Sequence, residues 1–246
     1  MLPLQFLGQN LHFAISLFAA LVFFAVFWLY FDAWTAQRRK SRTDLYIWGG
    51  FLLASISFLV QATVIEQSVL GKSIFGEASQ TVATLLRVAG YALIVAGQLL
   101  GPLQKKPHTQ SIEAELTQEQ QPAVPAVAAT SSFGLAYILP AGALAIAALY
   151  YRRATQGLEK HLRPVAYAFA LLFVFELLSL ASLGRGTDNL ALYNLLKAFG
   201  PLWLASQLFL LAGVLVLGRW VWHYLTERFM SQLFMEIGRA SCRERV

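Results

Sequence analysis

Residues 13–31 read FAISLFAALVFFAVFWLYF, 19 consecutive positions without a charged side chain. A helix needs about 20 mostly apolar residues to cross a hydrocarbon core of roughly 30 Å, so this stretch predicts a membrane span. Because the bilayer core holds no water, such a segment must be helical to satisfy its backbone. Similar stretches recur along the chain, which gives six apolar segments at 11–31, 45–65, 81–100, 133–151, 165–183 and 198–218. The sequence therefore predicts an all-α fold, a polytopic transmembrane helical bundle in two three-helix halves.

The composition indicates the same class of protein. The chain is 57% hydrophobic and 13% charged, whereas soluble domains carry about 25% charged residues. Basic residues beside membrane spans account for a modest positive charge, so no nucleic-acid partner is expected. We expect the lipid bilayer as the partner and the bacterial cytoplasmic membrane as the location.

The last ten residues, IGRASCRERV at 237–246, match the translation of a common short-read sequencing adapter in one reading frame. We interpret them as an artefact joined after Glu236, so that the native continuation of the chain is missing. Three arginines and one glutamate belong to this tail, and without them the formal net charge falls from +6 to +4. The single cysteine, Cys242, also belongs to it, so no disulfide or cysteine-based metal site is expected.

Composition divides the chain into consecutive parts. A first three-helix membrane half, 1–101, precedes a polar linker rich in proline and alanine at 102–132. A second three-helix half follows at 133–225. We interpret 226–236 as the start of a truncated further helix, which the adapter-like tail interrupts.

The basic loops predict conflicting orientations. Basic residues favour the cytoplasmic side of short loops, and this places both the cluster at 38–42 and the cluster at 152–163 inside. Three segments separate the two clusters, so they cannot share a side if every segment spans. The fourth segment contains Pro140 and Gly142, which we take as candidate helix-break positions. A broken or re-entrant fourth segment would remove the conflict, and we favour an extracellular N-terminus.

Two charged residues lie well within the apolar segments, Arg87 in the third and Glu176 in the fifth. A charge at the centre of a membrane helix costs about 2.5–3.5 kcal/mol on insertion scales, so each needs a reason. Counted from the outer ends of their helices, both lie about 10 Å deep, which suggests an ion pair. The alternative is that Arg87 reaches the membrane surface while Glu176 is protonated or faces a wet cavity. Glu66, at the end of the second segment, is another candidate partner for Arg87.

No cofactor site is predicted by the remaining residues. The four histidines, His12, His108, His161 and His223, lie at segment edges or in loops, so paired haem ligands inside a span are not expected. The sequence contains no phosphate-binding glycine loop, no HExxH and no GxSxG motif. We therefore expect no cofactor, no metal site and no enzyme chemistry in the residues present.

Short motifs in the first half allow a comparison with a known class. The second segment ends in ATVIE at Ala62–Glu66, and the third carries RVAGY at Arg87–Tyr91. WLYF at Trp28–Phe31 precedes a basic loop. Over residues 1–100 the chain resembles the multi-helix membrane sensor regions that precede bacterial histidine kinases. It departs from that class in having six segments instead of the usual seven, and in the insert at 102–132.

This resemblance implies a membrane-embedded sensory or signal-input module of a two-component sensor kinase, with the kinase part missing. Trp220–Met235 leaves the sixth segment through a basic and aromatic stretch, as sensor kinases do on the way to their output domains. The expected partner is a second copy, joined through the missing output domain, and the ligand is not identified. Two other classes stay open: a small-solute or ion transporter that uses Glu176, and a structural membrane subunit.

Overall fold

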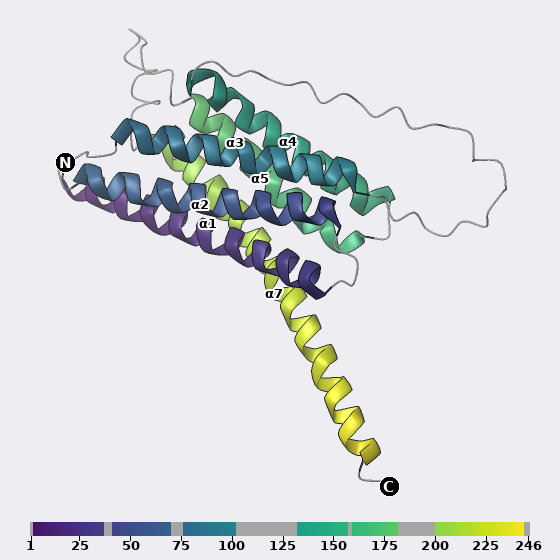
Figure 1. Ribbon diagram of the computed structural model, residues 1–246. Helices are drawn as coiled ribbons and strands as arrows, with labels where there is room; N and C mark the ends of the chain where they lie inside the picture. Colours follow the sequence, from purple (N-terminus) through teal and green to yellow (C-terminus); the bar gives the residue numbers. More distant parts are fainter. Residues whose placement is uncertain are drawn as a thin grey trace, which may run out of the picture.

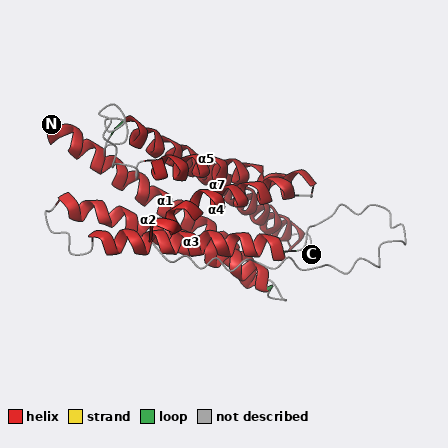
Figure 2. Ribbon diagram, turned by 90° about the horizontal axis from the view of Figure 1, so that it is seen from above, coloured by secondary structure: helices red, strands yellow, loops and turns green. Residues whose placement is uncertain are grey.

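The computed structural model describes residues 2–36, 41–69, 76–101, 132–156, 159–181 and 200–243, and this part of the chain is almost entirely helical, with no strand. Six long helices run roughly side by side (Figures 1 and 2). A short 3-10 helix, η1 (Lys160–Leu162), precedes the fifth. The long helices are α1 (Leu2–Ala36), α2 (Arg42–Val69), α3 (Gly76–Leu100), α4 (Ser132–Gln156), α5 (Arg163–Ala181) and α7 (Pro201–Arg243). Each contains one of the predicted apolar segments or most of it, so the all-α bundle is confirmed.

Five of these helices are long and apolar enough to cross a membrane, and the chain is an integral membrane protein. α4 is not among them, as far as its described residues go. The five span candidates are Asn10–Ala36, Arg42–Thr63, Ala78–Leu100, Lys160–Leu180 and Pro201–Glu227.

α3 and α4 run in the same direction, although they follow one another in sequence. Arg153, near the end of α4, donates to the carbonyl oxygens of Gln98 and Gly101 at the end of α3, at 2.7 and 2.9 Å. Farther from this end, and within the same two helices, Gly142 of α4 lies against Tyr91 of α3. The connection between α3 and α4, residues 102–131, lies outside the described residues, so the predicted linker is not tested.

This parallel arrangement places the described basic residues of both loops at one end of the bundle. The start of α2, with Arg42, lies beside the end of α3, because the site of a Cβ on Gly97 is 3.0 Å from the carbonyl oxygen of Thr43. The end of α4 and the start of α5 lie at this same end, where Arg153 meets Glu159 at 3.9 Å. The five span candidates then alternate in direction and place their described basic clusters at one end, which we call the basic end.

Two expectations about helix boundaries are wrong. Pro140 and Gly142 lie inside one continuous helix, α4, so there is no helix break at these positions. Membrane helices tolerate proline where neighbouring helices and local adjustments satisfy the freed backbone group. Residues 226–236 do not begin a separate helix either, because α7 continues through them. No glycine or proline lies between Gly218 and Glu236 to end the helix.

Aromatic side chains join the two halves of the bundle in its interior. Phe169 of α5 is fully buried. Its ring meets Phe23 of α1 at 6.2 Å and 85°, and Phe51 of α2 at 6.1 Å and 63°. It also stacks on Tyr150 of α4. Such edge-to-face pairs add about 0.5–1.5 kcal/mol beyond their buried area, so both halves share one core.

Glycines bring α2 and α3 into close contact at their centres. A Cβ on Gly50 would lie 2.6 Å from the carbonyl oxygen of Gly90, and a Cβ on Gly90 would lie 2.8 Å from that of Gly50. Small residues are the usual means by which membrane helices approach closely. A side chain at either position would push the two helices apart.

We therefore expect Gly50→Ala and Gly90→Ala each to lower stability by about 1–3 kcal/mol, the usual cost of overpacking. Gly49→Ala is the matched control, because its added Cβ would meet only the Leu93 side chain, at 4.0 Å. That variant should keep or slightly raise stability, since alanine is the better helix former. Unfolding followed by circular dichroism in detergent measures all three, and equal losses at 49 and 50 would contradict the close-contact explanation.

The helix directions predict which residues share a side of the membrane. Single cysteines at the exposed positions Ala36, Ala78 and Thr155, in a Cys242→Ser background, test this with a membrane-impermeant maleimide. In intact bacterial cells Ala78→Cys should be labelled, while Ala36→Cys and Thr155→Cys should react only after lysis, because basic ends face the cytoplasm. Labelling of Ala36→Cys and Thr155→Cys from opposite sides would show instead that the helices alternate through α4.

Candidate functional site

Arg87 lies inside the bundle and uses all three guanidinium nitrogens. It sits on α3 one turn before Gly90, and 6% of its side chain is exposed. Its Nε donates to Ser57 Oγ at 3.2 Å, and its Nη2 donates to Gln61 Oε1. Its Nη1 donates to Glu176 Oε1 at 3.0 Å. α2 therefore supplies two neutral acceptors and α5 supplies the countercharge.

Glu176 reaches this site from α5, and 3% of its side chain is exposed. Besides Arg87, it accepts a longer hydrogen bond from the hydroxyl of Tyr91 at 3.4 Å. Tyr91 is itself 1% exposed, and Gly142 of α4 leaves room for its ring, since a Cβ there would lie 3.2 Å from Tyr91 Cβ. α4 thus packs against Tyr91, the second hydrogen-bond donor to the Glu176 carboxylate.

Aromatic rings enclose the guanidinium. The Cζ of Arg87 lies 4.3 Å from the centroid of Phe58 and 5.9 Å from that of Phe175. A cation over an aromatic face gains about 2 kcal/mol when it is removed from water. Ser57 donates its own proton to the carbonyl oxygen of Ala83 at 2.7 Å, which orients the Oγ to accept from Arg87. The site is a closed ion pair in which each of the three guanidinium nitrogens donates a hydrogen bond.

Such a pair can hold two helices in one relative placement. Removing one partner of a buried pair typically costs about 3–5 kcal/mol, because the other charge is left uncompensated. Movement of α5 relative to α3 would separate the charges, so the pair favours one packing of the two helices. The described residues contain no group of three or more His, Cys, Asp or Glu that could hold a metal ion.

The candidates from the sequence have different outcomes. The structure brings Arg87 and Glu176 together as an ion pair. Glu66 lies in α2, but its side chain lies outside the described residues, so it stays an untested partner. Sequence reasoning missed Ser57 as a partner of Arg87. Its spacing of four from Gln61 places both on one helix face, a signal that was present.

A second buried polar cluster joins α1 and α7. His12 is 4% exposed, and its Nδ1 lies 2.9 Å from Gln207 Oε1. The amide oxygen can only accept, so Nδ1 carries the proton and Nε2 is free to accept from Ser16 Oγ at 3.3 Å. Gln207 thus forms a hydrogen bond between α7 and α1. His12 lies within α1 and belongs to this cluster.

The basic end has a further link that the sequence did not predict. Arg153 caps the last carbonyls of α3 and pairs with Glu159 just before η1. A cation at a helix C-terminus interacts favourably with the helix dipole. In sequence, Arg153 is one basic loop residue among several, and only the parallel placement of α3 and α4 gives it this role.

No protein-family model, curated protein or solved structure matches this chain. The function must therefore be argued from the site and the helix arrangement.

The ion pair predicts a non-additive stability change. Arg87→Leu and Glu176→Leu should each lower the free energy of unfolding by about 3–5 kcal/mol, because each leaves one buried charge without its partner. The double variant should lose less than either single variant, since both charges are then gone. Unfolding in detergent measures the free energy of unfolding of the wild type, the two single variants and the double variant.

The exposed pair of His223 and Glu227, at 3.1 Å with side chains 75% and 67% exposed, supplies the control. Glu227→Gln should change stability little, because exposed pairs contribute little. Strictly additive losses at Arg87 and Glu176 would show that the two side chains do not interact.

Proposed function

We propose that this chain is the membrane-embedded signal-input module of a two-component sensor kinase, whose kinase part is missing from the sequence. The observation that carries this proposal is the last helix. α7 has no interruption between Pro201 and Glu236, the last residue before the adapter-like tail, and it projects well beyond the other helices (Figure 1). A continuous helix transmits a shift in the bundle to whatever follows it.

α7 is connected to the buried ion pair through α5. Gly213 of α7 lies against α5, since a Cβ there would be 3.1 Å from the carbonyl oxygen of Ala168 and 3.3 Å from the Leu172 side chain. Glu176 lies on this same helix, one turn beyond Leu172. A change in the position of α5 therefore reaches both Arg87 and α7.

The proposed mechanism is a choice between two helix packings. In the packing described here Arg87 and Glu176 are paired, and a stimulus would favour a second packing in which α5 has moved away from α3. A stimulus can shift this balance only by its difference in affinity for the two packings. The second polar cluster, His12 with Gln207, holds α7 to α1, so only part of α7 needs to follow α5.

The closed ion pair favours this function over a transporter. In the packing described here Glu176 is 3% exposed and is engaged by Arg87 and Tyr91, so ion binding at Glu176 would require this pair to separate. If Glu176 bound a transported ion, uptake into proteoliposomes would depend on pH and would be lost in Glu176→Gln.

The first test is to recover the unbroken gene and read past codon 236. A phosphoacceptor histidine and an ATP-binding kinase domain downstream would support the proposal. A stop codon directly after residue 236 would contradict it, and would leave the transporter and the structural subunit as the remaining classes.

The second test uses the full-length protein in liposomes. Arg87→Gln and Glu176→Gln should change the autophosphorylation rate at least about fivefold, the lower end of typical coupling between sites. Leu177→Ala, next to Glu176 but facing outward with 49% exposure, is the matched control and should leave the rate unchanged. Rates that stay the same in both charge variants would contradict a role of the pair in signalling.

A further inference from the structure

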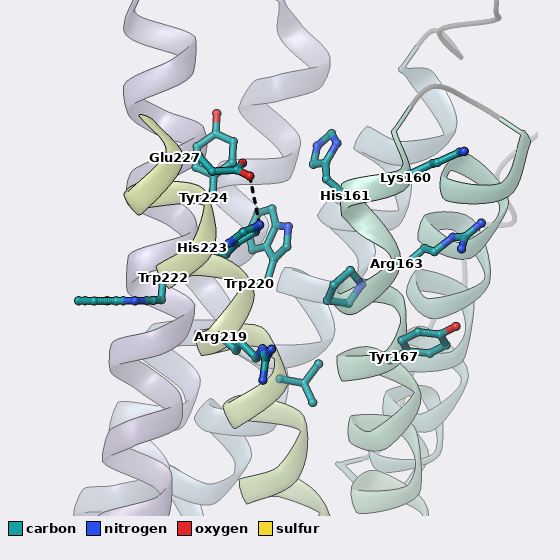
Figure 3. A pocket seen from close by; sticks show the side chains of 12 residues that line it. Lys160, His161, Arg163, Tyr167, Arg219, Trp220, Trp222, His223, Tyr224 and Glu227 are labelled. Atoms are coloured by element: carbon teal, nitrogen blue, oxygen red, sulfur yellow. Dashed lines mark ion pairs between the residues drawn. The ribbon is translucent and has the colours of Figure 1, made fainter. Parts of the chain in front are cut away.

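A groove lies between the start of α5 and the middle of α7 at the basic end (Figure 3). Its volume is about 900 Å³. It is lined by basic, aromatic and apolar side chains from these two helices and from η1. Neither the ion pair nor the His12 cluster contributes to it, so it is a separate feature of the molecule.

The groove carries an excess of positive charge. Lys160 and Arg163 lie on the α5 side and Arg219 on the α7 side, and all three are exposed. Glu227 is the one carboxylate in the lining, and it is already engaged by His223 at 3.1 Å. Within the described residues, none of the three cations has an ion-pair partner. The groove is therefore suited to an anion.

Its position is at the level of the lipid headgroups. At the basic end, one candidate span begins at Lys160 and the other ends at Glu227. The lining therefore covers the first turns of the α5 span and the last turns of the α7 span. Large aromatic side chains are exposed there, with Tyr167 at 56% and Trp222 at 73%, which is typical of the membrane interface. An occupant would have its charged part beside the cations and its apolar part in the bilayer.

Figure 3 shows how the side chains of the lining lie. Arg219 and Trp220 lie on the side of α7 that faces α5, and His161 lies across the space from them, while Lys160 and Arg163 extend from the α5 side away from α7. Val216 and Pro164 continue the lining, and these apolar side chains suit an acyl chain or glycerol carbons. Basic pockets between membrane helices on the cytoplasmic side are known to bind anionic headgroups.

We propose that the groove between α5 and α7 binds an anionic phospholipid, whose negatively charged headgroup is attracted by the three cations of the lining, Lys160, Arg163 and Arg219. This proposal does not depend on the signalling function. If both hold, the lipid lies against α7 just where this helix leaves the membrane, so the anionic lipid content would influence the output helix.

The test measures retained lipid on the purified full chain by native mass spectrometry. The protein is incubated in detergent with cardiolipin, phosphatidylglycerol or phosphatidylcholine. Cardiolipin and phosphatidylglycerol should bind clearly more tightly than phosphatidylcholine. Equal retention of phosphatidylcholine would overturn the proposal, and this comparison needs no variant.

Charge-neutral variants then locate the site. Arg163→Gln/Arg219→Gln should bind cardiolipin on the order of thirtyfold more weakly, given the usual contribution of a basic side chain at the membrane surface. Arg42→Gln/Arg152→Gln removes two charges from the same end but outside the groove, and should bind as the wild type does. Both pairs are exposed, so unchanged helicity by circular dichroism is expected. Equal affinity of the two double variants would overturn the proposal.

Two further measurements distinguish a bound lipid from other occupants of the groove. Millimolar inorganic phosphate should leave the lipid bound, and its displacement by phosphate would show a soluble-anion site instead. If the wild type forms a dimer that the Arg163→Gln/Arg219→Gln variant does not, the groove is covered by a second copy, and the lipid proposal is wrong.

Discussion

The guanidinium of Arg87 cannot reach water, and the centre of the bundle is built to satisfy it. An unsatisfied charge or N–H group in such surroundings costs several kcal/mol. Ser57 and Gln61 on one neighbouring helix and Glu176 on another accept its hydrogen bonds. These contacts therefore define the relative placement of α2, α3 and α5 in the packing described here. The close contact of Gly50 with Gly90 sets the spacing of α2 and α3, because a wider spacing would move Ser57 out of reach.

The second constraint is the placement of charge along the bundle axis. The described basic residues at the helix ends gather at one end because α3 and α4 are parallel, and Arg153 forms part of the link that holds these two helices together there. If α4 instead ran antiparallel to α3, two of the basic clusters would lie on opposite sides of the membrane. Basic residues near short loops carry a strong preference for one side, so the tertiary arrangement and the charge distribution agree.

α5 joins the features that bear on function. It carries Glu176 in the bundle interior, packs on α7 at Gly213, and provides Arg163 at the basic end. A displacement of this one helix would affect the ion pair, the output helix and the groove together. The proposed signal input and the proposed lipid site therefore share a structural element, although each is tested by its own experiment.

The sequence by itself determined the membrane class, the six apolar segments found in the described long helices, and the two charges within these segments. These are local properties: a long apolar run forces a helix in lipid, and a charge within it is visible without knowing its neighbours. Pro140 and Gly142 were misjudged because their effect depends on neighbours, and Gly142 makes room for Tyr91 of α3. Only the tertiary structure decided that Arg87 meets Glu176, that α4 runs parallel to α3, and that α5 and α7 form a basic groove. Each of these is a contact between residues far apart in the chain, and the direction and rotation of a helix are set by such contacts rather than by its own sequence.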